Sequence, residues 1–188
     1  MIGCFDSMRT EREDPMNRVY AERLRRGHEN LELFIGQLNH RGISYRVRAA
    51  EALGNSGDEK AVMPLIFCMM NDPETEVVYM AACSLGKLRD RRAVQPLISK
   101  LKSSEKWVRR GAAKSLGIIG DREAVDPVSE LLSDEVPEIR AAAAEAIGMI
   151  SYWDAVDRII PLLEDPEPEV RVSARKAVRM LGRGDLAD

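Results

Sequence analysis

The sequence predicts an all-α solenoid of stacked helix pairs. A ten-residue unit recurs five times, and its tenth residues stand at positions 54, 86, 117, 148 and 179, separated by 32, 31, 31 and 31 residues. A second apolar unit recurs in the same register as "AVMPLIFCMM", "AVQPLISKLK", "AVDPVSELLS" and "AVDRIIPLLE". Both units have the length and apolar spacing of helices, and no segment alternates as a strand would. A fixed period with two helices per repeat is typical of solenoids.

The composition places the chain among ordinary folded proteins. Of 188 residues, 45% are hydrophobic and 31% are charged, which is too apolar for a disordered chain. The net charge of −3 argues against nucleic-acid binding, which needs a basic surface. No apolar run approaches the length of a membrane span, so no membrane contact is expected.

The N-terminus predicts a mobile polar arm at 1–14, followed by a single solenoid at 15–188. "PMNRVYAERLRRG" reads as a capping helix, and "HENLELFIGQLNH" reads as the first outer helix. The start has neither the basic nor the apolar region of a secretion signal. The three cysteines lack metal-site spacing and are an odd number, which predicts a reducing, cytoplasmic compartment.

Glycines, aspartates and prolines at recurring positions indicate where each helix should begin and end. Four glycines at the tenth position are expected to end helices with a positive φ: Gly54, Gly86, Gly117 and Gly148. Three aspartates are expected to cap the helices that follow: Asp58, Asp90 and Asp121. Three prolines fall in the first turns of those helices, where a missing N–H is tolerated: Pro64, Pro96 and Pro127.

The fifth copy departs from the others. Its sixth position is Arg175 and its tenth is Arg179, where the other copies have alanine and glycine. A long, charged arginine side chain is expected at this position where no further repeat packs against the helix. The sequence therefore predicts a C-terminal cap at 170–188, and about five helix pairs in all.

The pattern VRxxAAxALGxIGDxxAVxPLIxxL resembles the HEAT-like repeat of the bilin-lyase type, which is also used in designed repeat binders. The resemblance covers roughly residues 29–181. It implies a right-handed superhelix in which the first helix of each pair lies outside and the second lines a concave groove. It also implies that the groove residues vary with the partner.

Helical phase predicts which residues of the ten-residue unit face the groove. At 100° per residue, positions 3, 4, 7 and 11 share one face, opposite the alanines and leucines. The candidate partner-binding residues on this face are Arg48, Tyr79, Met80, Cys83, Lys87, Arg110, Lys114, Ile118, Glu145 and Met149. Methionines beside an aromatic residue and several cations favour a protein or peptide partner with apolar and acidic groups.

Several alternatives remain open for this face. Tyr79 and Met80 could instead pack over neighbouring helices, or the apolar residues could mediate weak self-association of an otherwise monomeric chain. Cys83 could have a lowered pKa if Arg110 and Lys114 lie close to it. Trp107 and Trp153 are secondary candidates, expected on opposite edges of the solenoid and more readily explained by packing on neighbouring side chains.

Arginine recurs at the second position as Arg46, Arg109, Arg140 and Arg171, interrupted by Val78. With acids such as Asp72, Asp134 and Asp165, these arginines are expected to tie neighbouring repeats together, as the resemblance implies.

The sequence contains no recognisable catalytic or metal-binding set, so a non-catalytic scaffold without a cofactor is expected. Deoxyhypusine hydroxylase-like repeats need several His-Glu pairs, and this chain has only His28 and His40. Alkylpurine glycosylase-like repeats need a basic groove with stacking aromatics, which one tyrosine does not supply. The alternative is a lyase-like accessory protein or chaperone that binds a tetrapyrrole, a bilin or its carrier protein.

Overall fold

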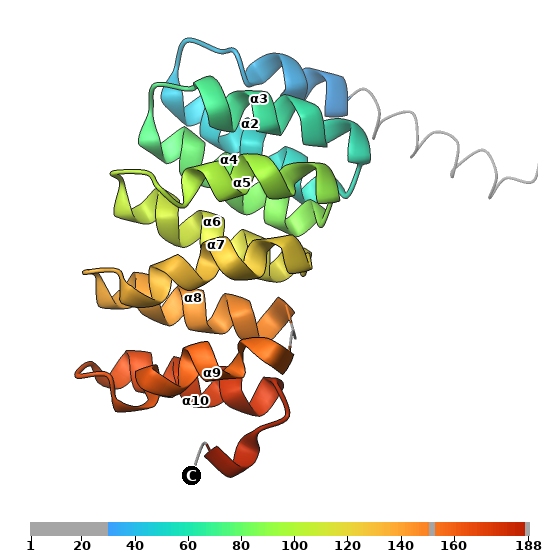
Figure 1. The fold of residues 1–188 in the computed structure, drawn as a ribbon. Helices are drawn as coiled ribbons and strands as arrows, with labels where there is room; N and C mark the ends of the chain where they lie inside the picture. The colour runs from blue at the N-terminus through green and yellow to red at the C-terminus, as the bar shows by residue number, and fades with distance from the viewer. Residues whose placement is uncertain (1–29, 151–152, 187–188) are drawn as a thin grey trace, which may run out of the picture.

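The computed structural model describes residues 30–150 and 153–186. Over these residues the protein is an all-α solenoid in which helix pairs stack in two layers (Figure 1). This confirms the predicted fold class, and no strand occurs in the described ranges. The predicted arm at 1–14 and the capping helix that begins at Pro15 lie outside the described residues.

Each pair contributes one helix to each layer. The inner layer holds the helices of the ten-residue unit: α2 Ile43–Ser56, α4 Thr75–Leu88, α6 Lys106–Ile119, α8 Pro137–Ile150 and α10 Pro168–Met180. The outer layer holds a helix at 30–37, α3 Val62–Asn71, α5 Val94–Lys100, α7 Val125–Ser129 and α9 Val156–Ile159. The last two continue as 3-10 turns η4 Glu130–Ser133 and η6 Ile160–Glu164, and a final turn, η7, spans Gly184–Leu186.

The predicted aspartate caps are confirmed. The side chains of Asp58, Asp90 and Asp121 accept hydrogen bonds from the backbone N–H two residues on. Each caps a short 3-10 turn that leads into the outer helix: η1 Glu59–Ala61, η2 Arg91–Ala93 and η3 Arg122–Ala124. The caps satisfy N–H groups that lack partners within the helix.

The prediction that the tenth-position glycines end helices is wrong. Each inner helix continues two residues beyond its glycine, and the left-handed residues lie further on, at Gly57, Arg89 and Gly120. The glycines instead permit close packing of successive inner helices. A Cβ on Gly117 would lie 2.7 Å from Cα of Ala146, and a Cβ on Gly86 would lie 2.8 Å from Cα of Ser115. These distances leave no room for any larger residue.

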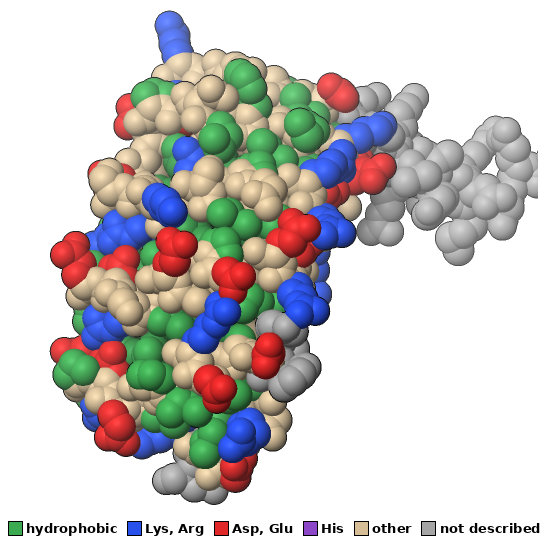
Figure 2. All heavy atoms as spheres, viewed as in Figure 1, with side chains coloured by type: hydrophobic (Ala, Val, Ile, Leu, Met, Phe, Trp, Pro, Cys, Tyr) green, Lys and Arg blue, Asp and Glu red, His purple; other side chains and the backbone are tan. Residues whose placement is uncertain are grey.

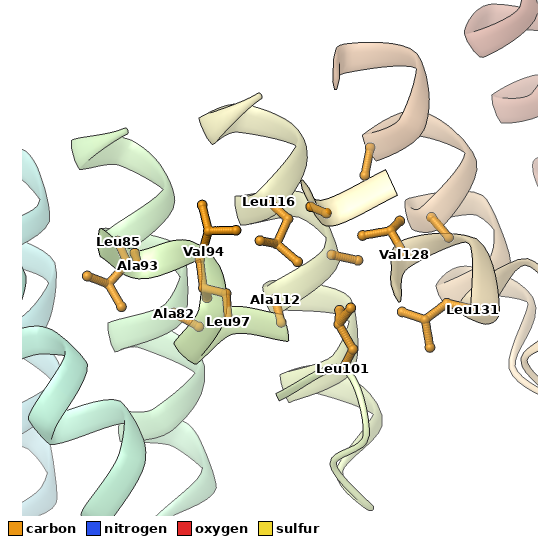
Figure 3. Close-up of a cluster of buried hydrophobic side chains, with 14 of the residues drawn as sticks. Ala82, Leu85, Ala93, Val94, Leu97, Leu101, Ala112, Leu116, Val128 and Leu131 are labelled. Carbon is orange, nitrogen blue, oxygen red and sulfur yellow. The ribbon is translucent and has the colours of Figure 1, made fainter. Parts of the chain in front are cut away.

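One continuous core runs between the two layers. Figure 3 shows its middle, where Leu85, Leu97 and Leu116 meet between neighbouring repeats. The alanines at the fifth and sixth positions of the inner helices are fully buried, including Ala82 and Ala113. Arg175, at the sixth position of α10, is exposed, as the sequence predicts for the fifth copy.

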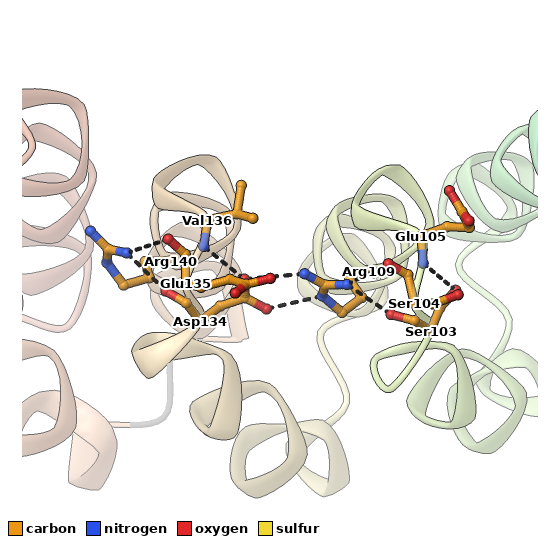
Figure 4. A network of polar contacts seen from close by, with 8 residues as sticks. All are labelled: Ser103, Ser104, Glu105, Arg109, Asp134, Glu135, Val136 and Arg140. Carbon is orange, nitrogen blue, oxygen red and sulfur yellow. Dashed lines mark hydrogen bonds and ion pairs between the residues drawn. The ribbon is translucent and has the colours of Figure 1, made fainter.

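Buried ion pairs connect the repeats along one edge. Arg140 donates to both carboxylate oxygens of Asp165 at 2.8 and 2.9 Å, and it also donates to the backbone carbonyls of Asp134 and Glu135. Arg109 forms the same bonds with Asp134 and with its own preceding loop (Figure 4). Each arginine thus holds the loop before its own helix and the loop of the next repeat. Arg46 forms the same pair with Asp72, so the predicted ladder is confirmed for three of its arginines. Among the described residues, Arg171 donates only to the carbonyls of its own preceding loop.

The ladder has no ion pair that starts from α4, and both residues that would form this pair are replaced. Val78 replaces the arginine, and Ser103 stands where the other repeats have the aspartate. Val78 is buried, and the Ser103 hydroxyl accepts from the Glu105 N–H as Asp134 accepts from the Val136 N–H. The serine therefore preserves the turn without leaving a buried carboxylate unpaired.

Candidate functional site

The solvent-facing side of the inner helices is here called the inner face. All ten predicted binding residues belong to α2, α4, α6 and α8, and none of them is fully buried. Successive inner helices contact one another more extensively than successive outer helices do. The glycine contacts above explain this difference. Closer spacing in the inner layer favours curvature toward that layer, the side on which the resemblance places a groove.

The predicted residues differ in exposure. Arg48 and Lys87 are exposed, and the other eight are half-buried: Tyr79, Met80, Cys83, Arg110, Lys114, Ile118, Glu145 and Met149. The expectation that the fourth position is exposed is wrong in the later repeats, because Gly111, Ala142 and Ser173 are buried there. The reason is geometric, since short side chains at this position are covered by the adjacent inner helix.

Tyr79 packs against the next helix. A Cβ on Gly111 would lie 2.9 Å from Cδ2 of the tyrosine ring, so the ring lies directly over the α6 backbone. Met80 packs partly against the core. Both side chains remain half-exposed, so packing accounts for one side of each and leaves the other side available to solvent.

Of the two possibilities left open for Cys83, the structure favours the unreactive thiol. Burial raises the pKa of the Cys83 thiol above its ordinary value. A hydrogen bond with Tyr79 and the charges of Lys87, Lys114 and Arg110 act in the opposite direction and do not outweigh it. A raised thiol pKa means less thiolate at neutral pH, and therefore lower reactivity.

Some charges of the inner face are satisfied within the protein and others are not. Lys87 donates to the Asn55 side chain at 2.9 Å, and Lys176 lies 3.7 Å from the Glu145 carboxylate. Within the described part of the chain, Arg110 and Lys114 have no carboxylate within ion-pair distance. These two half-buried cations on α6 are available to a ligand.

Trp107 lies in the first turn of α6, the entry position that the sequence predicts, and its ring lies beside Arg110 of the inner face. It is 51% exposed, and the Arg110 guanidinium lies 5.9 Å from its ring centre. The Lys106 ammonium group lies 5.1 Å from the same ring centre. Trp153 begins the 3-10 turn η5 Trp153–Ala155, and its side chain lies outside what the structure describes.

Two acidic residues of the inner face were missed by the sequence analysis. Glu138 and Glu169 line a hollow of about 180 Å³ together with Arg110, Lys114 and Glu145. They directly precede the ten-residue unit, in the place that Trp107 occupies in the third copy. At 100° per residue this place falls at about 60°, between positions 7 and 11. Assigning a face to this position, one residue before the unit, would have identified Trp107, Glu138 and Glu169 from the sequence.

An apolar patch on the outer layer was also missed. Met63, Phe67 and Met70 of α3 are 55%, 64% and 45% exposed, beside a hollow of about 670 Å³ between α3 and the helix at 30–37. Apolar side chains gather around α3 in Figure 2, whereas charged side chains are interspersed from α5 onward. The other copies have polar, charged or proline residues at the Met63 and Phe67 positions, so comparing the copies of the second unit would have revealed the patch.

Replacing Met63 by Gln and Phe67 by Ser installs the residues that the next copy carries as Gln95 and Ser99. Because both side chains are exposed, the free energy of unfolding should change by no more than about 0.5 kcal/mol. Removing exposed apolar area should raise the ammonium sulfate concentration at which the protein precipitates. Urea denaturation and a precipitation series measure the two effects. Equal precipitation of variant and wild type would contradict the expectation.

None of the helices at 30–150 and 153–186 combines the length and apolar character needed to cross a bilayer. Over the same ranges, no three His, Cys, Asp or Glu side chains come together in a way that could hold a metal ion.

Comparison with solved structures gives several similar repeat proteins. The complex of CpcE and CpcF of phycocyanin lyase from Nostoc sp. PCC7120 contains a chain 30% identical, with a TM-score of 0.76. The similarity covers 84% of this protein and 66% of that chain, so the protein spans slightly less than two thirds of its length. A comparison with curated proteins gave no match.

Designed armadillo repeat proteins are similar in fold. One was solved in complex with the peptide (KR)4; it is 17% identical, with a TM-score of 0.60 and coverage of 90% of this protein and 95% of the design. Another was computationally designed for modular peptide recognition; it is 20% identical, with a TM-score of 0.56 and coverage of 83% and 88%.

The repeats themselves match a known family. HEAT repeats match residues 31–99, 64–146 and 125–187, which together span nearly the whole described part of the chain. The same register carries the buried alanines, the aspartate caps and the arginine ladder. The protein therefore belongs to the HEAT repeat family.

Proposed function

We propose that this protein is a non-catalytic adaptor that binds a protein or peptide on its inner face. The observation that carries this proposal is the pair of half-buried cations on α6, Arg110 and Lys114, which no carboxylate of the described residues neutralises. Two neighbouring cations that have no carboxylate partner in the protein can pair with acidic groups of a ligand. Apolar side chains border them, since Met80 lies on α4 and Ile118 on α6.

The chemistry of this surface suits a polypeptide. Tyr79 and Met80 offer half-exposed apolar area, and the cations and acids around them can pair with side chains or backbone groups. The peptide-recognising armadillo designs are similar in fold, which supports a polypeptide as the ligand. The partner would carry apolar and acidic groups.

A displayed library of random peptides, selected on the wild-type protein, tests the proposal. Selected peptides should bind at least about tenfold more weakly to a variant with Met80→Ser and Lys114→Ser. The outer-face variant Met63→Gln/Phe67→Ser is the matched control and should bind them as the wild type does. Circular dichroism verifies that both variants keep their helices. Peptides that bind both variants equally well would overturn the proposal.

The similarity to the phycocyanin lyase complex supports a second candidate function, an accessory role in handling a bilin or the protein that carries it. It is the comparison with the highest sequence identity among the structures named above, and it covers most of this protein. Under this alternative, Arg110 and Lys114 would face the propionate groups of a tetrapyrrole. Titration with a bilin should then shift and intensify its visible absorbance, and the Arg110→Ser/Lys114→Ser variant should not produce this change. An unchanged spectrum with the wild type would exclude it.

A further inference from the structure

The hollow on the inner face separates two sets of opposite charges. Arg110 and Lys114 of α6 line one side, and Glu138 of α8 and Glu169 of α10 line the other. No ion pair joins the two sides within the described part of the chain, so none of these cations lies within 4.0 Å of a carboxylate there. The protein itself leaves both sets unneutralised.

Three small residues line the hollow together with the charged ones: Ala141, Ala142 and Ser173. Ala142 and Ser173 are buried beneath it. Glu145, the remaining acid of the hollow, is engaged by Lys176 at 3.7 Å. Glu138 and Glu169 are therefore the acids available to a ligand.

Two half-exposed apolar residues of the inner face, Tyr79 and Met80, lie on one side of this hollow. Tyr79 and Met80 belong to α4, which precedes α6 in the stack (Figure 1). Successive inner helices therefore offer the apolar pair Tyr79 and Met80 on α4, a basic pair on α6 and the acids Glu138 on α8 and Glu169 on α10, with other side chains between them. A ligand complementary to all three would be apolar, then acidic, then basic along its length.

The spacing of the charges fits an extended peptide. Packed helices lie about 8–10 Å apart, and an extended chain rises about 3.3 Å per residue. An acidic and a basic side chain two or three residues apart would therefore reach α6 and α8 at the same time. Building on the peptide-binding function above, we propose that the inner face selects peptides whose apolar, acidic and basic residues follow one another in that order. The peptide can bind in either chain direction, provided that its residues keep this order along the inner face.

Four fluorescein-labelled peptides of about eight residues test this proposal by fluorescence anisotropy. Two carry leucines, then glutamates, then lysines, one in each chain direction; the other two exchange the glutamates and lysines. At least one peptide of the first order should bind about tenfold or more tightly than both peptides of the second order. All four have the same composition and net charge, so a general attraction to charge cannot produce the difference.

A charge exchange on the protein completes the test. In the Lys114→Glu/Glu138→Lys variant the preference should fall to less than about twofold, because each side of the hollow then carries mixed charges. The matched control is Lys102→Glu/Glu130→Lys, which reverses an exposed ion pair of the outer layer and leaves the net charge unchanged. This control should keep the wild-type preference.

Equal affinity for the two orders, or no binding by any of the four peptides, would overturn the charge-order proposal. Library-selected peptides that still depend on Met80 and Lys114 would in that case leave the peptide-binding function standing. Loss of that dependence would overturn the function as well.

Discussion

Replacing Asp165 by serine should lower the free energy of unfolding by about 2–4 kcal/mol. The Arg140 side chain is only 13% exposed, and it would lose both of its bonds to the carboxylate. The serine can still accept from the Glu167 N–H, as Ser103 accepts from the Glu105 N–H. The loss of stability therefore measures the contribution of the ion pair rather than that of the turn. Urea denaturation followed by far-UV circular dichroism measures it.

The protein supplies its own control at the Val78 and Ser103 positions. The double variant Arg140→Val/Asp165→Ser copies this natural pair and removes the unpaired guanidinium. It should therefore recover about half of the stability that the single Asp165→Ser variant loses. A double variant less stable than the single one would show that the arginine stabilises the repeat mainly through the loop carbonyls of Asp134 and Glu135.

The same pair predicts a pH dependence. The hydrogen bonds from Arg140 hold the pKa of Asp165 below its usual value of 3.8. A carboxyl group with a lowered folded pKa stabilises the protein above its unfolded pKa, and this contribution disappears as the pH falls through the folded pKa. The stability difference between wild type and the Asp165→Ser variant should therefore shrink between about pH 6 and about pH 3. A constant difference would contradict the role of the carboxylate.

Replacing Gly117 by alanine should destabilise the protein by about 1–3 kcal/mol, although alanine is the better helix former. The new Cβ would lie 2.7 Å from Cα of Ala146, and backbone cannot move aside as a flexible side chain can. The helices α6 and α8 would have to separate. Thermal and urea denaturation measure the loss.

Gly36 provides the matched control. It lies in the helix at 30–37, and a Cβ there would meet no atom within 4 Å. The Gly36→Ala variant should be as stable as wild type or up to about 1 kcal/mol more stable, because only the helix propensity changes. Similar losses in both variants would show that close packing is not what requires glycine at position 117.

The missing ion pair of the ladder can be found by comparing the repeat copies in the sequence. Val78 and Ser103 change together, and comparing the copies identifies both departures without coordinates. Only the structure shows that each ladder arginine also binds the carbonyls of its own loop.

The candidate site was predicted only in part. Placing positions 3, 4, 7 and 11 on one face found Arg110 and Lys114, which do lie together beside the hollow. It missed Glu138 and Glu169, and it treated Ala142 as exposed because the phase of one helix does not say which positions a neighbour covers. It left open whether Tyr79 faces solvent or packs on a neighbouring helix, and the ring lies over Gly111 of the next repeat.

The sequence by itself determined the architecture, because the period and the apolar spacing are local signals that recur through the copies, and the aspartate caps recur three times. The tertiary structure alone decided the role of the tenth-position glycines, the raised pKa of Cys83 and the separation of charges across the hollow. Each of these depends on how closely one repeat approaches the next. That distance is set by packing between residues about 30 positions apart, which a helical pattern within one repeat does not contain.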